Sequence, residues 1–208
     1  MTTWIVFYCL AAYLLGSVSS AILLCKLLGL PDPRTQGSLN PGATNVVRIA
    51  GKRVGVFVLV FDILKGAVPA YLAYLSQLSE FAIGLVAICA CLGHMYPVFF
   101  QFKGGKAVAT ALGAMLPMGW ALAAGLLSTW VLVFAISKLS SLAAIVTVSL
   151  APVFTYFYKP QFTFSVTMLS VLIIVKHRSN ISRLINRKER EVGQNLSNKH
   201  RAKSRQED

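Results

Sequence analysis

The amino-acid sequence predicts an all-α protein, a polytopic membrane helix bundle of seven transmembrane helices, with five as the alternative. Of the 208 residues, 56% are hydrophobic and only 13% are charged, against roughly 25% charged residues in soluble domains. The mean hydropathy is +0.65. This composition offers too little charge for a water-exposed surface and too much apolar surface for intrinsic disorder. A soluble globular domain and a disordered chain are therefore both excluded.

The apolar segments that predict these helices begin near the N-terminus. Residues 4–28 form a run of 25 residues, long enough to cross a hydrocarbon core of about 30 Å. The run lacks a basic leader and a small-residue cleavage site, so we interpret it as a retained helix. Residues 54–75 and 81–97 predict the second and third spans.

The segment from residue 107 to residue 137 leaves two interpretations open. It is too long for one straight span, and Pro117 and Gly119 interrupt it. It forms either one long tilted helix or a short helix followed by a second one that returns across the bilayer. Residues 139–158 and 161–175 predict the remaining spans, which gives seven or five in total.

Basic residues orient these spans and divide the chain. The loop 29–53 holds four Lys and Arg residues, the loop 98–106 holds two, and the part after residue 175 holds ten, whereas the opposite side offers only Lys159. Because such residues collect on the cytoplasmic side, we expect the N-terminus outside and the C-terminus in the cytoplasm. We expect a membrane-embedded domain over residues 1–191 and a disordered, basic cytoplasmic tail over residues 192–208. The tail has no aromatic residues for stacking on bases, so we expect no nucleic-acid partner.

Three polar segments fall on the predicted cytoplasmic side. The first, residues 37–48, reads G-S-L-N-P-G-A-T-N-V-V-R, and Thr44 or Asn45 is a candidate cap for a short helix. Its polar side chains, a glycine backbone and one cation form a candidate phosphate cradle, with an ordinary capped turn as the alternative. The candidates are Ser38, Asn40, Gly42, Thr44, Asn45 and Arg48.

The second and third segments add further cations. Residues 93–110 read G-H-M-Y-P-V-F-F-Q-F-K-G-G-K-A-V-A-T, in which two lysines flank a flexible diglycine at the start of a helix. Residues 177–189 read H-R-S-N-I-S-R-L-I-N-R-K-E, in which His177 and Asn180 share a helix face. The alternatives are lysines that only anchor a helix, a structural His94, and a helix that lies along the lipid headgroups.

Together the three segments resemble the signature motifs of the bacterial acyl-phosphate:glycerol-3-phosphate acyltransferases, the PlsY family. The order and spacing agree, and the resemblance extends to D-P-R at residues 32–34 and D-I-L-K-G at residues 62–66. Two positions depart from the family pattern, because Leu39 and Arg187 stand where the family often has glycine. The departure at Arg187 weakens any role for Glu189.

The resemblance implies transfer of an acyl group from an acyl phosphate to the sn-1 hydroxyl of glycerol 3-phosphate. The products are lysophosphatidic acid and phosphate, and the reaction is the first step of phospholipid biosynthesis. It implies the bacterial inner membrane, the two substrates and membrane lipids as partners, and neither a cofactor nor a metal. The implied catalytic residues are His177, Asn180 and Lys103. Phosphate binding falls to the first-segment candidates and to His94, Gly104, Gly105, Lys106, Ser141 and Arg183.

The residues leave the general base open. An acyl phosphate is already activated, so no nucleophilic serine or cysteine is needed, and no G-x-S-x-G motif occurs. The H-x-x-x-x-D signature of soluble glycerolipid acyltransferases is also absent, because no aspartate stands five residues after any histidine. Two candidates for the base are left, His177 and the oxygens of the acyl phosphate. Asp62 and Lys65, one turn apart in an apolar span, form either a structural pair or a buttress for the active site.

Two other classes of function compete with an acyltransferase. A membrane transporter for an organic phosphate anion would use the same basic cluster, but it needs polar access on both faces, and the outer side offers few polar residues. A structural membrane scaffold would explain the tail but not the glycine-rich segments.

Overall fold

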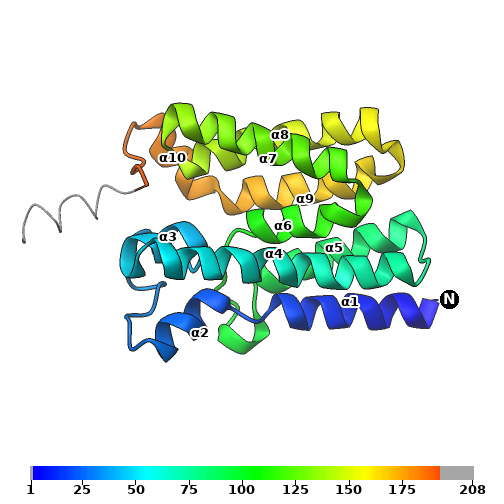
Figure 1. The fold of residues 1–208 in the computed structure, drawn as a ribbon, viewed down its shortest axis with the longest axis horizontal. Coiled ribbons are helices and arrows are strands. Elements are labelled where there is room, and N and C mark those ends of the chain that lie inside the picture. Colours follow the sequence, from blue (N-terminus) through cyan, green and yellow to red (C-terminus); the bar gives the residue numbers. More distant parts are fainter. Residues whose placement is uncertain (1, 193–208) are drawn as a thin grey trace, which may run out of the picture.

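The computed structural model of the protein describes residues 2–192, and every regular element in this range is helical, which confirms the all-α prediction (Figure 1). The predicted tail lies outside the described residues except for Val192, whose backbone N–H donates a hydrogen bond to the Lys138 carbonyl at 3.3 Å. The α-helices are α1 (Thr2–Gly16), α2 (Ser20–Leu27), α3 (Ala43–Ala50), α4 (Lys52–Leu75), α5 (Glu80–Met95), α6 (Val108–Met115), α7 (Trp120–Ser137), α8 (Ser140–Tyr158), α9 (Thr163–Lys176) and α10 (Arg178–Ile185).

Among the described residues, five helical stretches are long and apolar enough to cross a membrane. They are Thr3–Leu27, Lys52–Leu75, Glu80–Phe100, Trp120–Ser137 and Ser140–Tyr158. Two shorter apolar helical stretches, Val108–Met118 and Pro160–Lys176, correspond to the other two predicted spans. The total of seven and the orientation of the termini stay predictions.

The structure decides between the two interpretations of residues 107–137 and corrects the first span. α6 ends in a 3₁₀ turn at Leu116–Met118, and α7 begins at Trp120, so two helices replace one long one. The first span is also broken, because α1 ends at Gly16 and α2 begins at Ser20. The Lys65 ammonium donates at 3.1 Å to the Val18 carbonyl, so a carbonyl that the break frees finds a partner.

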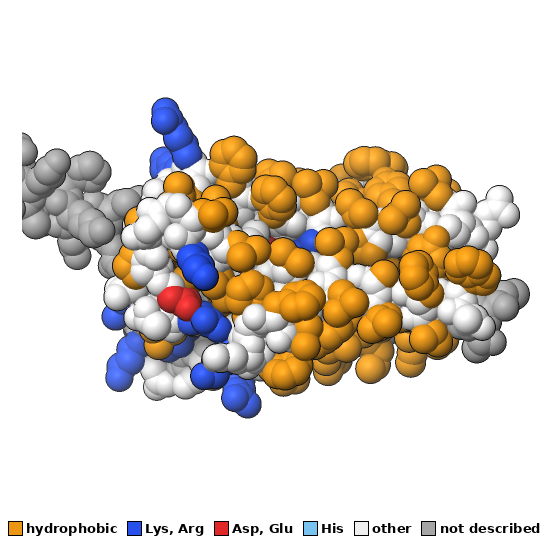
Figure 2. All heavy atoms as spheres, turned by 90° about the horizontal axis from the view of Figure 1, so that it is seen from below, with side chains coloured by type: hydrophobic (Ala, Val, Ile, Leu, Met, Phe, Trp, Pro, Cys, Tyr) orange, Lys and Arg blue, Asp and Glu red, His pale blue; other side chains and the backbone are white. Residues whose placement is uncertain are grey.

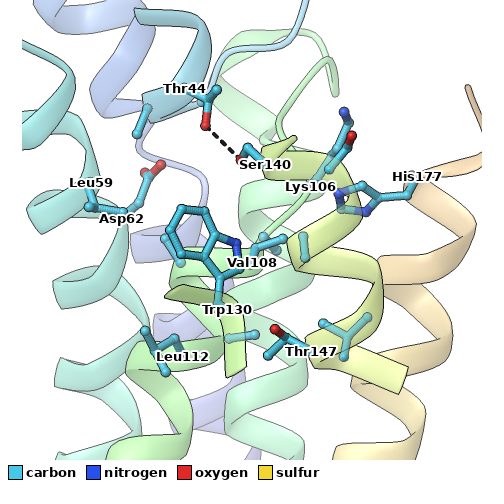
Figure 3. A pocket seen from close by; sticks show the side chains of 18 of the residues that line it. Thr44, Leu59, Asp62, Lys106, Val108, Leu112, Trp130, Ser140, Thr147 and His177 are labelled. Atoms are coloured by element: carbon cyan, nitrogen blue, oxygen red, sulfur yellow. Dashed lines mark hydrogen bonds between the residues drawn. The ribbon is translucent and has the colours of Figure 1, made fainter. Parts of the chain in front are cut away.

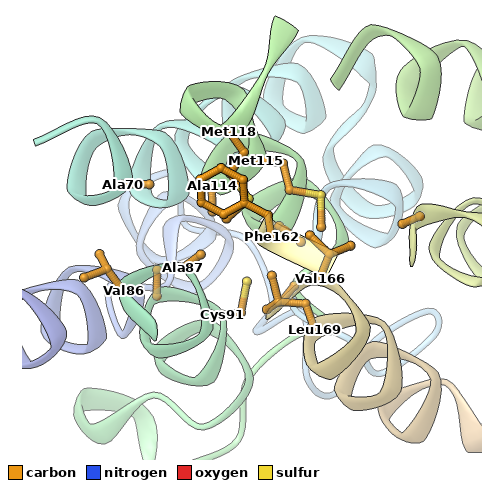
Figure 4. Packing of buried hydrophobic residues seen from close by; sticks show 14 of the residues in the cluster. Ala70, Val86, Ala87, Cys91, Ala114, Met115, Met118, Phe162, Val166 and Leu169 are labelled. Atoms are coloured by element: carbon orange, nitrogen blue, oxygen red, sulfur yellow. The ribbon is translucent and has the colours of Figure 1, made fainter. Parts of the chain in front are cut away.

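Close helix packing places α6 directly against α4. A Cβ on Gly66 would overlap the Thr110 carbonyl, and a Cβ on Gly113 would overlap the Ile63 carbonyl. Small residues at such crossings are how helices associate in lipid, where dispersion contacts replace the hydrophobic drive. Figure 4 shows the core beside this contact, where Cys91 of α5, Met115 of α6 and Leu169 of α9 meet.

The surface separates an apolar belt from a basic end. Large apolar side chains such as Trp4, Phe57 and Phe61 are exposed around the belt. Figure 2 shows them covering most of the visible face, while most of the visible Lys and Arg side chains gather at one end. This end carries α2, α3 and α10 (Figure 1).

Candidate active site

A cavity of about 260 Å³ lies where the three polar segments meet (Figure 3). Of the residues predicted from the sequence, eleven line it: Ser38, Asn40, Gly42, Thr44, Asn45, Arg48, His94, Lys106, Ser141, His177 and Asn180. Four others do not line it: Lys103, Gly104, Gly105 and Arg183. The structure therefore joins most of the predicted site, from positions up to about 140 residues apart in the chain.

Asn45 fixes the shape of the first loop. Its side chain is buried; the amide oxygen accepts from the Ser38 N–H at 2.8 Å, and the amide nitrogen donates to the carbonyls of Pro33 at 2.8 Å and Gln36 at 3.0 Å. Gly42, not Thr44 or Asn45, occupies the cap position of α3. The predicted cap was wrong because the Asn45 side chain turns back to the preceding loop.

Thr44 and Arg48 tie the first segment to other parts of the chain. The Thr44 hydroxyl lies 3.2 Å from the Ser140 hydroxyl at the start of α8. The guanidinium of Arg48 donates to the Arg190 carbonyl at 3.2 Å while it also lines the cavity. One cation of the predicted cradle thus also holds the segment that follows α10.

Both departures from the family motifs stand at positive φ. Leu39 has φ 60° and Arg187 has φ 54°. This left-handed region is open to glycine and costs other residues roughly 1–2 kcal/mol. The backbone conformation therefore explains why glycine suits both positions, and here the loops adopt it without glycine.

The two glycines between the lysines serve close packing, which corrects the expectation of a flexible diglycine. A Cβ on Gly104 would overlap the His94 carbonyl, and a Cβ on Gly105 would overlap the His94 ring nitrogen Nε2. The Gly105 N–H also donates to the His94 carbonyl at 3.0 Å. The loop therefore lies directly on His94 and sets the place from which Lys106 extends.

Lys106 joins the second polar segment to the third. Its ammonium donates a hydrogen bond to the side-chain oxygen of Asn180. The amide nitrogen of Asn180 donates to one carboxylate oxygen of Glu189 at 2.6 Å, and Arg183 donates to the other at 2.6 Å. Arg183 thus contributes by neutralising Glu189 at the edge of the site.

Glu189 is a cavity-lining residue that the sequence reasoning left out. Its signal was present, because it is the first carboxylate in a long basic run. The substitution of arginine for glycine at position 187 had argued against it. The left-handed backbone at Arg187 keeps the turn, and Glu189 reaches Asn180.

The polar end of the cavity holds an excess of cations. Burial lowers the pKa of Lys106 to about 8; Glu189 opposes this shift, and Arg183 and Arg48 add to it by repulsion. A buried ammonium that is costly to keep charged is stabilised by an incoming anion. This end of the cavity therefore suits a phosphate group.

His177 is neutral at physiological pH. Its Nδ1 lies 2.8 Å from the Ile173 carbonyl, and since a carbonyl only accepts, Nδ1 carries the proton and Nε2 has the free lone pair. Burial, with repulsion from Lys106 as a further cause, lowers the pKa of His177 to about 4. In Figure 3 the ring lies beside Lys106 at the polar end of the cavity.

Lys103 lies outside the cavity. Its side chain is exposed, whereas Lys106, three positions later, is half-buried and lines the cavity. Its catalytic role stays a prediction.

The opposite end of the cavity is apolar. Its walls include Leu112, Met115, Leu126, Trp130, Val148 and Ala151. The Trp130 ring stacks on Phe134 with centroids 5.0 Å apart and lies across the middle of the view in Figure 3. A tryptophan inside an apolar span gave no signal in the sequence. The cavity can therefore hold an anion at one end and a hydrocarbon chain at the other.

Two hydroxyls in the cavity wall are free to bind a ligand. Within the described part of the chain, Ser141 Oγ and Thr147 Oγ1 are buried and form no hydrogen bond, although the Ser141 hydroxyl lies beside the Glu189 carboxylate. Since buried polar groups are usually paired, these two are candidates for contact with a polar group of a ligand.

The chain is similar to known proteins along almost its whole length. A family model described as glycerol-3-phosphate acyltransferase matches residues 6–187. The glycerol-3-phosphate acyltransferase of Pasteurella multocida (strain Pm70) is 53% identical over 199 residues, which cover 96% of this chain and 99% of that protein. The glycerol-3-phosphate acyltransferase of Shewanella sediminis (strain HAW-EB3) is 57% identical over 183 residues, which cover 88% of this chain and 92% of that protein.

Solved structures agree with these relatives. A crystal structure of PlsY (YgiH), an integral membrane glycerol 3-phosphate acyltransferase, in its glycerol 3-phosphate form gives a TM-score of 0.86 at 40% identity. The match covers 90% of this chain and 94% of that one. The lysophosphatidic acid form of PlsY gives 0.83 at 39% identity.

Proposed function

This chain belongs to the glycerol-3-phosphate acyltransferase family, and we propose that it uses an acyl phosphate to acylate the sn-1 hydroxyl of glycerol 3-phosphate. The products are lysophosphatidic acid and inorganic phosphate. The glycerol-3-phosphate acyltransferase activity follows from membership of the family. The acyl phosphate as donor and the sn-1 hydroxyl of glycerol 3-phosphate as acceptor are the proposal.

The observation that carries the proposal is the two-ended cavity. Arg48 and Lys106 stand at its polar end, and Leu112, Trp130 and Val148 stand at its apolar end. Two phosphate-bearing substrates repel each other unless cations lie between them, and an acyl chain requires a dry wall. An acyl phosphate combines both requirements in one molecule.

The transfer is a direct attack. The substrate hydroxyl oxygen forms a bond to the acyl carbonyl carbon, and the bond from that carbon to the bridging phosphate oxygen breaks, with its electron pair leaving on the phosphate. Because the donor is a mixed anhydride, positioning and charge neutralisation supply most of the catalysis. Arg48 and Lys106 stabilise the charge that collects on the leaving phosphate.

The proton of the hydroxyl ends on the leaving phosphate. His177 offers the Nε2 lone pair to the hydroxyl and so orients it, but a base with a pKa of about 4 is too weak to retain the proton. Of the two bases left open by the sequence, this favours the oxygens of the donor. Ser141 donates its free hydroxyl to a phosphate oxygen.

A purified enzyme in detergent tests the reaction. Incubation with palmitoyl phosphate and glycerol 3-phosphate should release phosphate and lysophosphatidic acid in equal amounts, with no covalent acyl adduct on any serine or cysteine by mass spectrometry. Palmitoyl-CoA serves as the control donor and should give no product. Turnover with palmitoyl-CoA but not with palmitoyl phosphate would refute the donor, and phosphate transport into vesicles without turnover would favour the transporter.

We also propose that the polar end faces the cytoplasm across the bacterial inner membrane, with the N-terminus outside. The exposed side chain of Lys103 and the basic end of the molecule support this orientation. A Lys103→Cys variant without the four native cysteines should resist a membrane-impermeant thiol reagent in whole spheroplasts and react in inverted vesicles. The opposite labelling pattern would overturn the orientation.

A further inference from the structure

Asp62, Lys65 and His94 form a buried cluster inside the membrane-spanning part of the protein. Their side chains are 4%, 7% and 7% exposed. The Lys65 ammonium lies 2.9 Å from Asp62 Oδ1, and the Ser20 hydroxyl donates to the same oxygen at 3.0 Å. Charges at such depth are costly and mark functional positions when they face a cavity.

One half of this cluster stabilises the broken first span. The Lys65 ammonium donates at 3.1 Å to the Val18 carbonyl, which lies between α1 and α2. A carbonyl freed by a helix break needs a partner in an apolar surrounding. This contact explains Lys65, but it does not explain why Asp62 lines the cavity.

The other half of the cluster points to the active site. His94 Nδ1 lies 3.6 Å from Asp62 Oδ1, too far for a hydrogen bond, and it has no hydrogen-bond partner among residues 2–192. At this distance the negative charge of the Asp62 carboxylate acts on the ring without a hydrogen bond. On its other side the ring meets Gly105, whose N–H is bonded to the His94 backbone, and Lys106 follows directly.

We propose that Asp62 is a positioning residue for acyl transfer, which acts through His94 on the glycine loop and so on the place of the Lys106 ammonium. The chain of contacts runs from Asp62 to the His94 ring, from the ring to Gly105, and from the loop to Lys106. This inference rests on the proposed function, because its readout is the binding of glycerol 3-phosphate during turnover.

A double-mutant cycle between Asp62 and Gly105 tests the inference. Asp62→Asn frees the His94 ring, and Gly105→Ala pushes a methyl group into it, so each should raise KM for glycerol 3-phosphate about 10- to 100-fold, the scale of a displacement near 1 Å. Because the overlapped ring is buried, the thermal midpoint of Gly105→Ala should also fall, so KM is measured at a temperature at which every variant is folded. Since both act on one ring, the double variant should stay within about threefold of the worse single variant, whereas independent effects multiply.

A second variant protects the test against misfolding. Asp62→Asn leaves the Lys65 ammonium buried without its partner, which is destabilising, so Asp62→Asn with Lys65→Gln removes both charges together and keeps an N–H donor for the Val18 carbonyl. This variant should fold and show the same raised KM for glycerol 3-phosphate. When it is combined with Gly105→Ala, the two increases in KM should again not multiply. Ser170→Ala, which removes a buried hydroxyl on α9 that lines no part of the cavity, should leave KM unchanged.

The outcomes separate this inference from the proposed function. A wild-type protein that does not turn over palmitoyl phosphate would refute the proposed function. If the wild type is active, three results would overturn the positioning role. They are increases in KM that multiply in the double variant, an unchanged KM in both Asp62 variants, and a loss of folded protein in both Asp62 variants.

Discussion

The ammonium of Lys106 donates a hydrogen bond to the side-chain oxygen of Asn180, which joins two polar segments 74 positions apart. Asn180 in turn donates to Glu189, so the cation, the amide and the carboxylate form one chain at the polar end of the cavity. A phosphate that enters must compete with this chain or extend it. The place of the Lys106 ammonium therefore depends on the tertiary structure.

Lys106→Ala should reduce kcat/KM more than Lys103→Ala does. Hydrogen bonds to charged groups contribute about 1.5–3 kcal/mol, so the loss at Lys106 should be roughly 10- to 150-fold. Loss of the exposed Lys103 side chain should reduce kcat/KM less than loss of the half-buried Lys106 side chain. Steady-state kinetics of the two matched variants measure the difference, and a larger loss at Lys103 would restore the catalytic role predicted from the sequence.

The alkaline limb of the pH profile should report Lys106. Its pKa in the free enzyme is about 8, so kcat/KM should fall as the pH rises above about 8 and the ammonium loses its proton. Lys106→Arg, which keeps its charge at any accessible pH, should move this limb upward. If the alkaline limb of kcat/KM lies at the same pH in Lys106→Arg, it reports the titration of another group.

The acid limb should lie far below the ordinary pKa of histidine. An unperturbed histidine titrates near 6.5, but the pKa of His177 is about 4, so only the titration of the substrate phosphate, near 6, should appear above pH 5. As the pH falls from about 6.5 towards 4, His177 becomes protonated in the unfolded chain but stays neutral in the folded protein. The free energy of unfolding therefore decreases over this range. Thermal midpoints of the wild type and His177→Asn over this range measure that loss, which should be smaller in the variant.

Asn45→Ala should destabilise the protein through the first loop. The change removes three hydrogen bonds and leaves the buried Pro33 carbonyl without its partner, which costs about 1–3 kcal/mol for an unsatisfied buried group. Ser38→Ala is the matched control, because its exposed hydroxyl lines the cavity, and it should lower activity with an unchanged thermal midpoint. Equal midpoints in the two variants would contradict the bracing role of Asn45.

Ala151→Phe should shift the preference towards shorter acyl phosphates. Ala151 is buried in the apolar wall of the cavity, and a phenyl ring there removes space that a long chain needs. The ratio of kcat/KM for dodecanoyl and hexadecanoyl phosphate should rise about tenfold, as expected for the loss of a few contacts in an apolar pocket. Ala135→Phe on the exposed face of α7 should leave the ratio unchanged.

Glycine at the two departures from the family pattern should be tolerated. Leu39→Gly and Arg187→Gly relieve a left-handed backbone, a gain of about 1–2 kcal/mol that the larger entropy of unfolded glycine partly offsets. We expect thermal midpoints equal to the wild type or a few degrees higher. Leu39→Val, with a β-branched side chain at the same φ, should lower the midpoint.

The sequence by itself determined the class of the protein and most of the residues that line the cavity. Composition and the length of the apolar runs depend only on local content, so the membrane bundle and most helix bounds follow from it; α4, for example, begins two residues before its predicted start. The break at Gly119 was visible as an alternative, whereas the break between α1 and α2 was hidden in a continuous apolar run.

Only the tertiary structure decided which of these residues meet. Periodicity places His177 and Asn180 on one face of one helix, but it contains no information on the helix packed against that face. The place of Lys106 in the cavity wall, the reach of Glu189 and the approach of Asp62 to His94 all depend on how distant helices pack, as at the crossing of Gly66 with Thr110. These crossings are set by the summed packing of side chains from distant segments, which no local pattern encodes.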